Sequence, residues 1–544
     1  MSPSVPIILR PGSLSMGHTA QLPLIWRLSI WIAIGAAKDT VRPKGLTIYI
    51  FGLTSKYVKD IEIVNGLTGA SLTHGEFRDQ SIRLASALRR LGLQKGDVVG
   101  IVSPNVPEFA IAFLGVAAMG GINTTINCTY TPEEIARQLE NSTASALVIH
   151  PFLLPVARKA AKLYTGLKYI ISMGSAKEDV LSLQDLLKDD GSLYPHNLEV
   201  NPAEDLLVLP YSSGTTGLPK GVMLTHRNIV ANILQTDNPY DRVMREATIC
   251  HLYGSMPDDY QETFIGILPM FHIYGMVPCM GISLKLGAKM VTLPEFNPQT
   301  YIEAIVKHKP TILHTVPPII GFLIQHPDVK KEFLENTHTL VCGAAPLGPA
   351  LIEALLKKFD HGMRFQEGYG MTEASPVTHM SSSETLIPGS CGPCIPNTMS
   401  KIVDINNGNI LGPDDGEGEL CVYGPQVMKG YYRNEKATIE TIDEDGWLHT
   451  GDIARCDHDQ NVFIVDRLKE LIKVKGLQVA PAELEDLLRL HPQVSDVAVI
   501  GLPDDRSGEL PRAYIVPKVA DACPDAIAEF VANEVAPHKN WKAE

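Results

Sequence analysis

The sequence lacks an excess of basic residues. Its 47 lysines and arginines are outnumbered by 61 aspartates and glutamates, and the formal net charge is -14. The basic residues also form no stripe along the chain, whereas a protein that binds nucleic acid is expected to have one. Nucleic acid is therefore excluded as the expected partner, and local lysines are better explained by an anionic small ligand.

The chain also lacks the cysteine spacing of a zinc site or a disulfide framework. Nine cysteines are scattered between Cys128 and Cys523, and their number is odd. This distribution is typical of reduced thiols in an intracellular protein. One stretch, Cys391-Gly392-Pro393-Cys394, matches the redox tetrapeptide of thioredoxin, but it lies far along the chain and not at the start of a small thioredoxin-like unit. We interpret this match as a coincidence.

No apolar run is long enough to span a bilayer. The most apolar stretch, residues 22–37, is interrupted by Arg27, and ten uncharged residues follow that arginine. A membrane-spanning helix needs about 20. The sequence therefore predicts a cytoplasmic protein without a peroxisomal signal at its last residues. Association of residues 22–37 with a membrane is an alternative that we do not favour.

A length of 544 residues exceeds one ordinary hydrophobic core and predicts at least two domains. From about residue 44, short apolar runs alternate with helical patterns, which indicates an α/β fold with parallel strands. We predict an atypical N-terminal extension (1–43), a large domain (44–465), a charged hinge (466–469) and a small α+β domain (470–544). Predicted strands are 98–103, 146–150, 206–211, 288–293, 339–343, 463–465, 477–479, 494–501 and 513–516, and predicted helices are 108–119, 481–490 and 524–535.

The most informative segment is a loop, residues 210–222, that is rich in glycine and hydroxyl side chains and follows an apolar run. Glycines allow backbone N–H groups to turn toward an anion, and hydroxyls and a lysine add donors and positive charge. Lys220 follows a proline and precedes Gly221, so the loop does not match the Walker pattern, and a P-loop kinase or ATPase is disfavoured. A flexible turn is the simpler alternative, but it would not require this lysine. The predicted phosphate-binding residues are Ser212, Ser213, Gly214, Thr215, Thr216, Gly217 and Lys220.

This loop resembles the nucleotide-binding signature of the adenylate-forming superfamily, which includes acyl-CoA synthetases, 4-coumarate-CoA ligases, beetle luciferases and peptide-synthetase adenylation domains. Further motifs of the family follow in its order at residues 271–275, 343–346, 366–373, 418–424, 447–452 and 465–476. The resemblance extends from about residue 44 to the last residue, and 4-coumarate-CoA ligase-like enzymes are the nearest members. It implies a large adenylate-forming domain of layered sheets and helices, followed by a small lid domain.

The activity that the resemblance implies is that of an ATP-dependent acid-CoA ligase. The enzyme would convert an aromatic or medium-chain carboxylic acid to acyl-AMP and then to acyl-CoA, with ATP, Mg²⁺ and coenzyme A as cofactors. It would act as a monomer or homodimer.

The resemblance also implies where the nucleotide binds. The loop ending at Lys220 would hold the β- and γ-phosphates, Thr372 would contact the α-phosphate, and Glu373 would ligate Mg²⁺, a cation that prefers carboxylate oxygens. Asp452 would accept hydrogen bonds from both ribose hydroxyls with help from Arg467. Adenine would lie between a turn of small residues and a glycine-rich segment, with Tyr369 stacked on it; these residues are Gly343, Ala344, Ala345, Pro346, Glu367, Gly368, Tyr369 and Gly370.

On the acid side, the resemblance places His272 beside the substrate carboxylate and Tyr274, Val316 and Gly368 around the acyl group. Taken alone, a histidine between two apolar residues is more often a core residue. In the second half-reaction the small domain would rotate about Lys469. This rotation would bring Lys473 and Gln478 to the acyl-adenylate, and Lys475 and Gly476 to coenzyme A.

The sequence departs from the family at its end. Members of the family carry a Pro-Lys-x-x-x-Gly-Lys segment whose final lysine neutralises charge during adenylation, and residues 537–544 do not match it. We therefore expect an incomplete small domain and adenylation slowed by about 10² to 10³. The alternative function is a catalytically impaired homologue that binds the nucleotide or acyl-adenylate. A peptide-synthetase unit is disfavoured because no carrier segment follows, and an oxidative luciferase is left open by the motifs alone.

Overall fold

The computed structural model describes residues 46, 50, 60–176, 179–212, 218–237, 245–246, 249–250, 260–382, 386–468, 470, 472–474, 477–479, 481–504, 508–519 and 521–535. The predicted N-terminal extension, most of the phosphate-binding loop (213–217), Lys469, Lys475 and Gly476 lie outside this set. Within the described ranges, no helix is long and apolar enough to cross a membrane.

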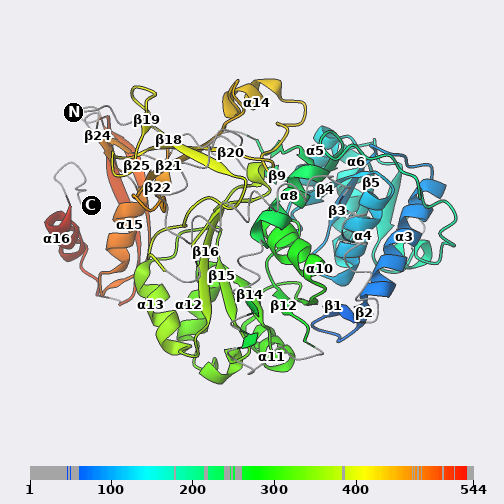
Figure 1. Ribbon diagram of the computed structural model, residues 1–544, viewed down its shortest axis with the longest axis horizontal. Coiled ribbons are helices and arrows are strands. Elements are labelled where there is room, and N and C mark those ends of the chain that lie inside the picture. Colours follow the sequence, from blue (N-terminus) through cyan, green and yellow to red (C-terminus); the bar gives the residue numbers. More distant parts are fainter. Residues whose placement is uncertain are drawn as a thin grey trace, which may run out of the picture.

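A seven-stranded sheet forms the first layer of the large domain (Figure 1). All of its strand pairs are parallel except that between β11 and β8. Its centre is β3, all of whose residues are buried, which explains the uninterrupted apolar run in the sequence. In spatial order the strands are β11 (Leu224–Thr225), β8 (Leu206–Val208), β4 (Ile122–Ile126), β3 (Val98–Val102), β5 (Ala144–Ile149), β6 (Tyr169–Ser172) and β7 (Leu181–Ser182).

An eight-stranded sheet forms the second layer. Its central strands are parallel, and only β2 and β17, at the two edges, pair in the antiparallel direction. In spatial order the strands are β17 (Val377–Met380), β16 (Arg364–Gly370), β15 (Thr339–Cys342), β14 (Ile312–Thr315), β12 (Thr263–Gly266), β13 (Lys289–Thr292), β1 (Ile61–Asn65) and β2 (Ser71–Thr73).

Helix α4 (Pro107–Ala118) packs between these two sheets, in contact with β3 and β4 on one side and β1 on the other. Every residue of α4 except Glu108 is buried, so its sequence is apolar all round and shows no amphipathic stripe. The helices of the two layers are α3 (His74–Arg90), α4, α5 (Pro132–Ser142), η3 (Pro151–Leu153), α6 (Leu154–Leu163), α7 (Leu183–Leu186), α8 (His226–Thr236), the π-helix η4 (Gly275–Gly281), α10 (Ile282–Leu286), α11 (Pro298–His308), α12 (Pro317–Gln325), η5 (Lys331–Leu334), α13 (Pro349–Lys358) and η6 (Thr372–Ala374).

A five-stranded antiparallel sheet completes the large domain, together with a short hairpin and helix α14 (Glu435–Thr441). The predicted strand at 206–211 is divided: β8 ends at Val208, and Tyr211 begins the hairpin, because Pro210 has no N–H to continue a ladder. The sheet contains β19 (Ile410–Leu411), β18 (Met399–Val403), β20 (Gly418–Tyr423), β21 (Leu448–Cys456) and β22 (Val462–Arg467), and the hairpin contains β9 (Tyr211–Ser212) and β10 (Lys220–Gly221).

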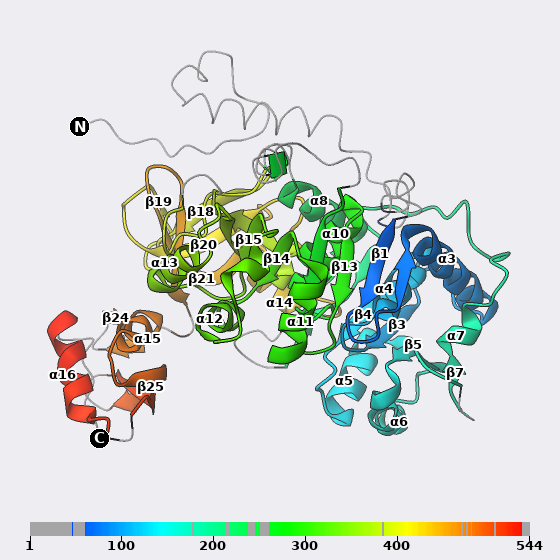
Figure 2. The same ribbon diagram turned by 90° about the horizontal axis from the view of Figure 1, so that it is seen from below.

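The small domain lies at one end of the molecule (Figure 2), where α15 contacts β22. Its helices pack on one face of a four-stranded sheet around a separate apolar cluster that includes Ile472, Leu484 and Val531. Because β22 continues through Asp466 and Arg467, the first half of the predicted hinge is strand. The elements are β24 (Leu477–Val479), β23 (Ile472–Val474), β26 (Gly508–Pro517), β25 (Val494–Asp504), α15 (Pro481–Arg489) and α16 (Pro524–Glu534).

The mixed α/β fold with a large layered domain and a small α+β domain confirms the fold class predicted from the sequence.

Candidate active site

One cavity of about 1020 Å³ lies where β14, β15 and β16 end against β20, β21, β22 and the β9–β10 hairpin. Ligand sites of α/β proteins commonly lie at the carboxyl ends of parallel strands. The cavity brings together most of the predicted site residues that are described: Ser212, Lys220, His272, Tyr274, Gly343, Ala344, Ala345, Pro346, Glu367, Gly368, Tyr369, Gly370, Thr372, Glu373, Asp452 and Arg467.

Three predicted residues lie elsewhere. Val316 lines a second, smaller cavity of about 420 Å³. Lys473 and Gln478 lie on the paired strands β23 and β24 of the small domain, directly opposite each other in register. Phe271 lines both cavities and therefore stands between them.

The described ends of the predicted phosphate-binding loop form the β9–β10 hairpin. Lys220 and Ser212 are directly opposite each other in this hairpin, so their side chains lie on the same face of it, where the loop begins and ends. The Lys220 ammonium lies 4.3 Å from the centre of the Tyr431 ring, a cation–π contact that fixes the position of the charge.

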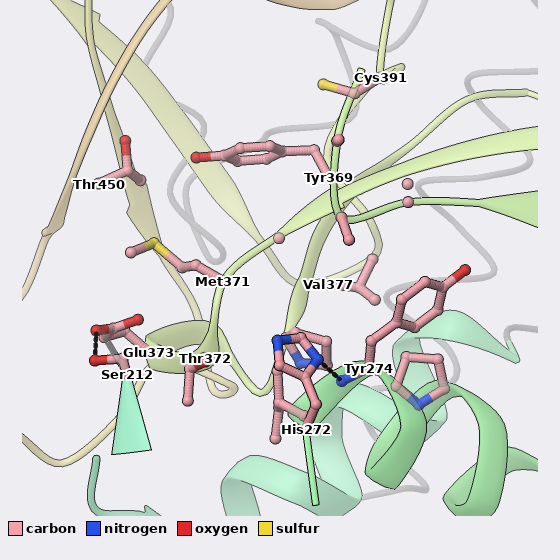
Figure 3. Close-up of a pocket in the computed structure, with 18 of the residues that line it drawn as sticks. Ser212, His272, Tyr274, Tyr369, Met371, Thr372, Glu373, Val377, Cys391 and Thr450 are labelled. Atoms are coloured by element: carbon pink, nitrogen blue, oxygen red, sulfur yellow. Dashed lines mark hydrogen bonds between the residues drawn. The ribbon is translucent and has the colours of Figure 1, made fainter. Parts of the chain in front are cut away.

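Glu373 follows strand β16 in the short helix η6 and is buried. Its Oε1 accepts hydrogen bonds from Ser212 Oγ (2.7 Å) and from the Tyr431 hydroxyl (2.8 Å). Figure 3 shows the bond between Ser212 and Glu373 at one side of the cavity, with Thr372 beside it. Both donors use the same oxygen, which leaves the second carboxylate oxygen available to a cation.

The predicted ribose-binding carboxylate, Asp452, lies at a bend of β21. The Tyr369 hydroxyl donates to its Oδ2 at 2.5 Å, and Arg467 Nε lies 3.5 Å from its Oδ1. Burial raises the pKa of Asp452, although the hydrogen bond from Tyr369 and the charge of Arg467 oppose this shift. The hydrogen bond to Asp452 was not foreseen for Tyr369, which was predicted only to stack on adenine.

The predicted adenine site combines a turn with a buried carboxyl group. In the turn, Ala344 has a left-handed backbone (φ 71°), a conformation that costs a residue with a Cβ about 1 kcal/mol. Glu367 Oε1 accepts a hydrogen bond from Leu347 N (3.1 Å), while its Oε2 is buried without a partner among the described residues. Burial raises the pKa of Glu367 to about 7.

His272 and Tyr274 lie on the side of the cavity opposite Ser212 and Glu373 (Figure 3). They come just before the π-helix η4 in the chain. His272 is exposed to the cavity. Desolvation by the protein around the ring lowers its pKa, so the imidazole is neutral at pH 7. Its Nδ1 accepts a hydrogen bond from Tyr274 N (3.2 Å), and a neutral ring therefore carries its proton on Nε2. A side chain at Gly275 would come within 2.1 Å of the Pro269 carbonyl oxygen, so this tight turn requires glycine.

Two residues that sequence reasoning did not single out lie beside the predicted nucleotide-binding residues. The Tyr431 hydroxyl donates a hydrogen bond to Glu373, and the Lys220 ammonium lies over the Tyr431 ring. Glu419 accepts a hydrogen bond from Gly451 N (3.1 Å) and contacts His449 Nδ1 (2.8 Å), which fixes the bend of β21 next to Asp452. The sequence signal was the motif at residues 418–424 for Glu419, and for Tyr431 it was only the stretch Gly430-Tyr431-Tyr432.

The environment of the tetrapeptide Cys391-Gly392-Pro393-Cys394 differs from that of a redox-active cysteine pair. Cys391 lines the cavity near Tyr369 (Figure 3) and Cys394 lies against His379 and Ser400. Burial raises the pKa of both thiols, that of Cys394 to about 11. Reactive redox cysteines have lowered pKa values, so these thiols are unsuited to such chemistry.

Known protein families and individual relatives match most of this chain. The family model of the AMP-binding enzymes matches residues 54–432, and that of the AMP-binding enzyme C-terminal domain matches residues 483–543. A 4-coumarate-CoA ligase of Oryza sativa subsp. japonica is 40% identical over 486 residues, which cover 88% of this chain and 84% of the relative. A 4-coumarate-CoA ligase of Petroselinum crispum is 39% identical over 514 residues, 92% of this chain and 90% of the relative.

Solved structures agree with the fold. ATP-bound MatB from Rhodopseudomonas palustris superposes with a TM-score of 0.78 at 27% identity and covers 91% of this chain and 93% of its own. The anthranilate CoA ligase AuaEII in complex with anthranoyl-AMP has a TM-score of 0.79 at 23% identity, covers 93% of both chains, and is similar in fold. The predicted resemblance is thereby confirmed: the chain belongs to the AMP-binding enzyme family, as an adenylate-forming ligase similar to 4-coumarate-CoA ligases.

Proposed function

We propose that this acid-CoA ligase activates an aromatic or medium-chain carboxylic acid as acyl-AMP, with release of pyrophosphate, and then transfers the acyl group to coenzyme A. The observation that supports the proposal is the continuity of the main cavity, which runs from Lys220 and Glu373 past Asp452 to His272 and Tyr274. A single space of this kind allows an acid carboxylate to approach the α-phosphorus of a bound nucleotide.

At the nucleotide end, the triphosphate would contact Ser212, Thr372 and Lys220, together with the hydroxyls of the loop between them. Mg²⁺, held by the second oxygen of Glu373, would neutralise phosphate charge. The chemistry of the donor set supports this assignment, because a buried carboxylate with one oxygen already fixed is a suitable ligand for a hard cation. Asp452 retains acceptor capacity for ribose hydroxyls beside Tyr369 and Arg467.

Glu367 would recognise the adenine ring. When the carboxyl group is ionised, its unpartnered Oε2 provides an acceptor for the exocyclic amino group, next to the turn that contains Gly343 and Ala344. A buried acceptor without a partner favours a ligand that supplies the missing donor over one that does not.

At the acid end, the Nε2–H group of His272 would donate a hydrogen bond to the substrate carboxylate and hold that group toward the nucleotide. Neutrality of the ring suits this role, since the histidine then orients the carboxylate without fixing it as a tight ion pair. Gly368 and Gly343 leave room beside the carboxylate, and Tyr274 covers the acyl group.

The thiol of coenzyme A would approach through the second cavity. That cavity is lined mainly by apolar residues, including Val316 and Ile319, and Phe271 separates it from the main one. This assignment moves Val316 from the acid side to the thiol side. The small domain would then supply Lys473 and Gln478 to the acyl-adenylate after turning about Lys469, with Lys475 and Gly476 beside coenzyme A.

The test measures the two half-reactions separately on purified protein. Pyrophosphate release is followed across a panel of carboxylic acids, and thioester formation is followed from a supplied acyl-adenylate with and without coenzyme A. Pyrophosphate release that depends on an acid, followed by thioester formation, supports the ligase. Absence of both activities would overturn it, and rapid thioester formation with little pyrophosphate release would indicate the impaired homologue.

Lys473→Ala sharpens this test. The variant should slow thioester formation from supplied acyl-adenylate and leave ATP binding unchanged, because the residue lies in the small domain. Lys518→Ala, an exposed lysine of the same domain, is the matched control. Equal thioester rates in the Lys473 and Lys518 variants would contradict the role of Lys473.

A further inference from the structure

Three side chains with metal-ligating atoms meet on the paired strands β20 and β21. They are Glu419, Cys421 and His449, and one ligand atom of each lies within 4.8 Å of the other two. Within the described ranges, no other group of three or more histidine, cysteine, aspartate or glutamate side chains is placed in this way. The cluster does not include Glu373, the proposed Mg²⁺ ligand, and the proposed function uses neither its thiol nor its imidazole.

The pairing of β20 with β21 brings these residues together. Glu419 and Cys421 are two positions apart on β20, so their side chains project from the same face of that strand. Cys421 lies directly opposite His449, and the register of β21 shifts between this pair and the pair of Glu419 with Ile453. Irregularities of this kind re-aim side chains. The shift therefore explains how Glu419 also reaches the imidazole.

The spacing of the ligand atoms suits a tetrahedral cation. Zn²⁺ binds sulfur at about 2.3 Å and nitrogen at about 2.0 Å, so a tetrahedral site places these two atoms about 3.5 Å apart. Cys421 Sγ lies 3.5 Å from His449 Nδ1. Glu419 Oε2 lies 2.8 Å from the same nitrogen, the length of a hydrogen bond, and would move away by about 0.5 Å to admit the ion. A small movement of one carboxylate thus converts the cluster into a site with three protein ligands.

Asp443 provides the outer partner that a metal-binding imidazole requires. His449 Nδ1 donates to Glu419 Oε2, and His449 Nε2 lies 3.6 Å from Asp443 Oδ2. When a cation takes Nδ1, the proton of the neutral ring must be on Nε2, where Asp443 is placed to accept it. Histidine ligands almost always donate their other N–H to a group such as a carboxylate. Asp443 is itself held in place, because its Oδ1 accepts hydrogen bonds from Asp445 N (3.0 Å) and Trp447 N (2.8 Å).

The donor set favours a thiophilic cation. Thiolate and imidazole are ligands of Zn²⁺, whereas Mg²⁺ prefers oxygen. Because the thiolate is the ligand, binding releases the Cys421 proton to solvent. The side chains of Glu419 and His449 line the main cavity and are 16% and 33% exposed, so an ion and a completing water molecule can reach them.

The cluster is also connected to the proposed ribose site. Glu419 Oε1 accepts a hydrogen bond from Gly451 N (3.1 Å), and Gly451 precedes Asp452 in β21. Figure 3 shows Thr450, which follows His449 and lines the main cavity. A cation that draws Glu419 Oε2 away from His449 turns the same carboxylate that holds the Gly451 N–H group. Occupation of the cluster should therefore displace Asp452.

We propose that Glu419, Cys421 and His449 form a binding site for Zn²⁺ or a similar thiophilic divalent cation, with Asp443 as the outer partner of the histidine. An ion bound there lowers the affinity for ATP and is distinct from the Mg²⁺ ion proposed at Glu373. Binding of the cation is independent of the proposed function, and its effect on the reaction rests on that function.

The first measurement is a titration of the full-length protein with Co²⁺, a spectroscopic substitute for Zn²⁺. Wild type should show the near-ultraviolet charge-transfer band of a cobalt thiolate, and Zn²⁺ should abolish the band by competition. Cys421→Ser should lose the band. His449→Gln should weaken Co²⁺ binding by about 100-fold or more and Asp443→Asn by about 10-fold, because loss of an outer partner alone costs about 10- to 100-fold. Cys523→Ser, which removes an exposed thiol, is the matched control and should bind as wild type does.

The second measurement is pyrophosphate release in excess Mg²⁺ with buffered Zn²⁺. Zn²⁺ should raise KM for ATP by about 10-fold in wild type and Cys523→Ser, within the usual range of coupling between two sites, and should have little effect in Cys421→Ser. Chelation of Zn²⁺ by ATP is the same for every variant, so the comparison isolates the protein site.

Two results would overturn the proposal. One is a wild-type spectrum without a thiolate band, and the other is Cys421→Ser and His449→Gln proteins that bind Zn²⁺ as tightly as wild type. Zn²⁺ that binds without changing KM for ATP would overturn the coupling. Thermal midpoints without metal separate a folding defect from a lost ligand. If no acid supports pyrophosphate release, the proposed function fails, and the Co²⁺ titration still decides the metal site.

Discussion

The proposed nucleotide end and the proposed acid end of the main cavity are built in different ways. The nucleotide end is assembled from short contiguous motifs, such as Thr372-Glu373 after β16 and Thr450-Gly451-Asp452 in β21. The acid end is a sheet face lined by residues of β12, β14, β15 and β16. A nucleotide is a constant ligand, so fixed motifs can bind it, whereas an acid pocket is shaped by whichever residues the sheet places side by side.

The proposed Mg²⁺ and ribose sites at the nucleotide end satisfy their polar groups differently from the sheet face at the acid end. At the nucleotide end, Glu373 and Asp452 each have hydrogen-bond donors from distant parts of the chain. At the acid end, His314 is held by aromatic contacts and its Nδ1 has no partner within the described chain. Changes at the first end should therefore affect every substrate alike, and changes at the second should depend on the acid.

The largest effect is expected from Glu373→Ala. Loss of the carboxylate removes the proposed Mg²⁺ ligand and should lower the rate of pyrophosphate release by about 10² to 10³ with every acid, the scale of one well-placed electrostatic contact. Tyr431→Phe removes only one hydrogen bond to Glu373 Oε1 and should cost about 10-fold or less. A Glu373 variant that is slow with one acid and normal with another would contradict the expectation that changes at the nucleotide end affect every acid alike.

A smaller effect is expected from Asp452→Asn. The amide keeps the size of the side chain but replaces one acceptor oxygen with a donor, so KM for ATP should rise by about 10- to 100-fold while KM for the acid stays constant. Tyr369→Phe, which removes the hydroxyl that donates to Asp452, provides the comparison and should have a weaker effect. Steady-state kinetics with ATP and acid varied in turn measure both constants. A rise in KM for the acid alone would contradict the assignment.

Gly368→Ala tests the acid end. A methyl group at Gly368 would meet no atom closer than 3.9 Å, so the protein should fold normally while the cavity narrows. KM should rise by about 10-fold for bulky aromatic acids and less for slender ones, with KM for ATP unchanged. Gly321→Ala, at a helical position where a side chain would meet nothing within 4 Å, is the matched control. Equal effects on all acids would show that Gly368 does not border the acyl group.

The last expected effect is on stability and not on the reaction: the free energy of unfolding should depend on pH through Glu367. Burial raises the pKa of this carboxyl from 4.5 to about 7, so between these values the folded protein holds a proton that the unfolded chain has released. The unfolding free energy of the wild type should therefore fall as pH rises, by at most about 1.4 kcal/mol per pH unit from this group. Glu367→Gln removes the contribution, and its stability relative to wild type should rise from pH 5 to 7 and then level.

Denaturant unfolding at several pH values measures this difference. Glu303→Gln, at an exposed position, is the control and should show no such trend. A relative stability of Glu367→Gln that does not change with pH would mean that Glu367 is ionised in the folded protein throughout this range.

Much of the fold could be read from the sequence because local patterns match the final elements. Apolar runs at residues 98–103 and 339–343 coincide with the buried strands β3 and β15, and the proline at residue 481 begins α15 as expected. The pairing of strands that lie far apart in the chain could not be predicted from the sequence. The order of the eight-stranded sheet places β1 beside β13, more than 200 residues away in the chain, and no local pattern encodes that contact.

The sequence by itself determined the family and the fold class, and it predicted the residues of the nucleotide end, because the residue types that bind phosphate and ribose must stand at fixed spacings in continuous segments. Only the tertiary structure decided which residues support them and what lies at the acid end. Tyr431 reaches Glu373 across 58 positions, and His314, Val341 and Gln366 become neighbours only through the register of three strands. The physical reason is that side-chain contacts depend on strand pairing and helix packing, whereas a motif depends only on the order of residues along the chain.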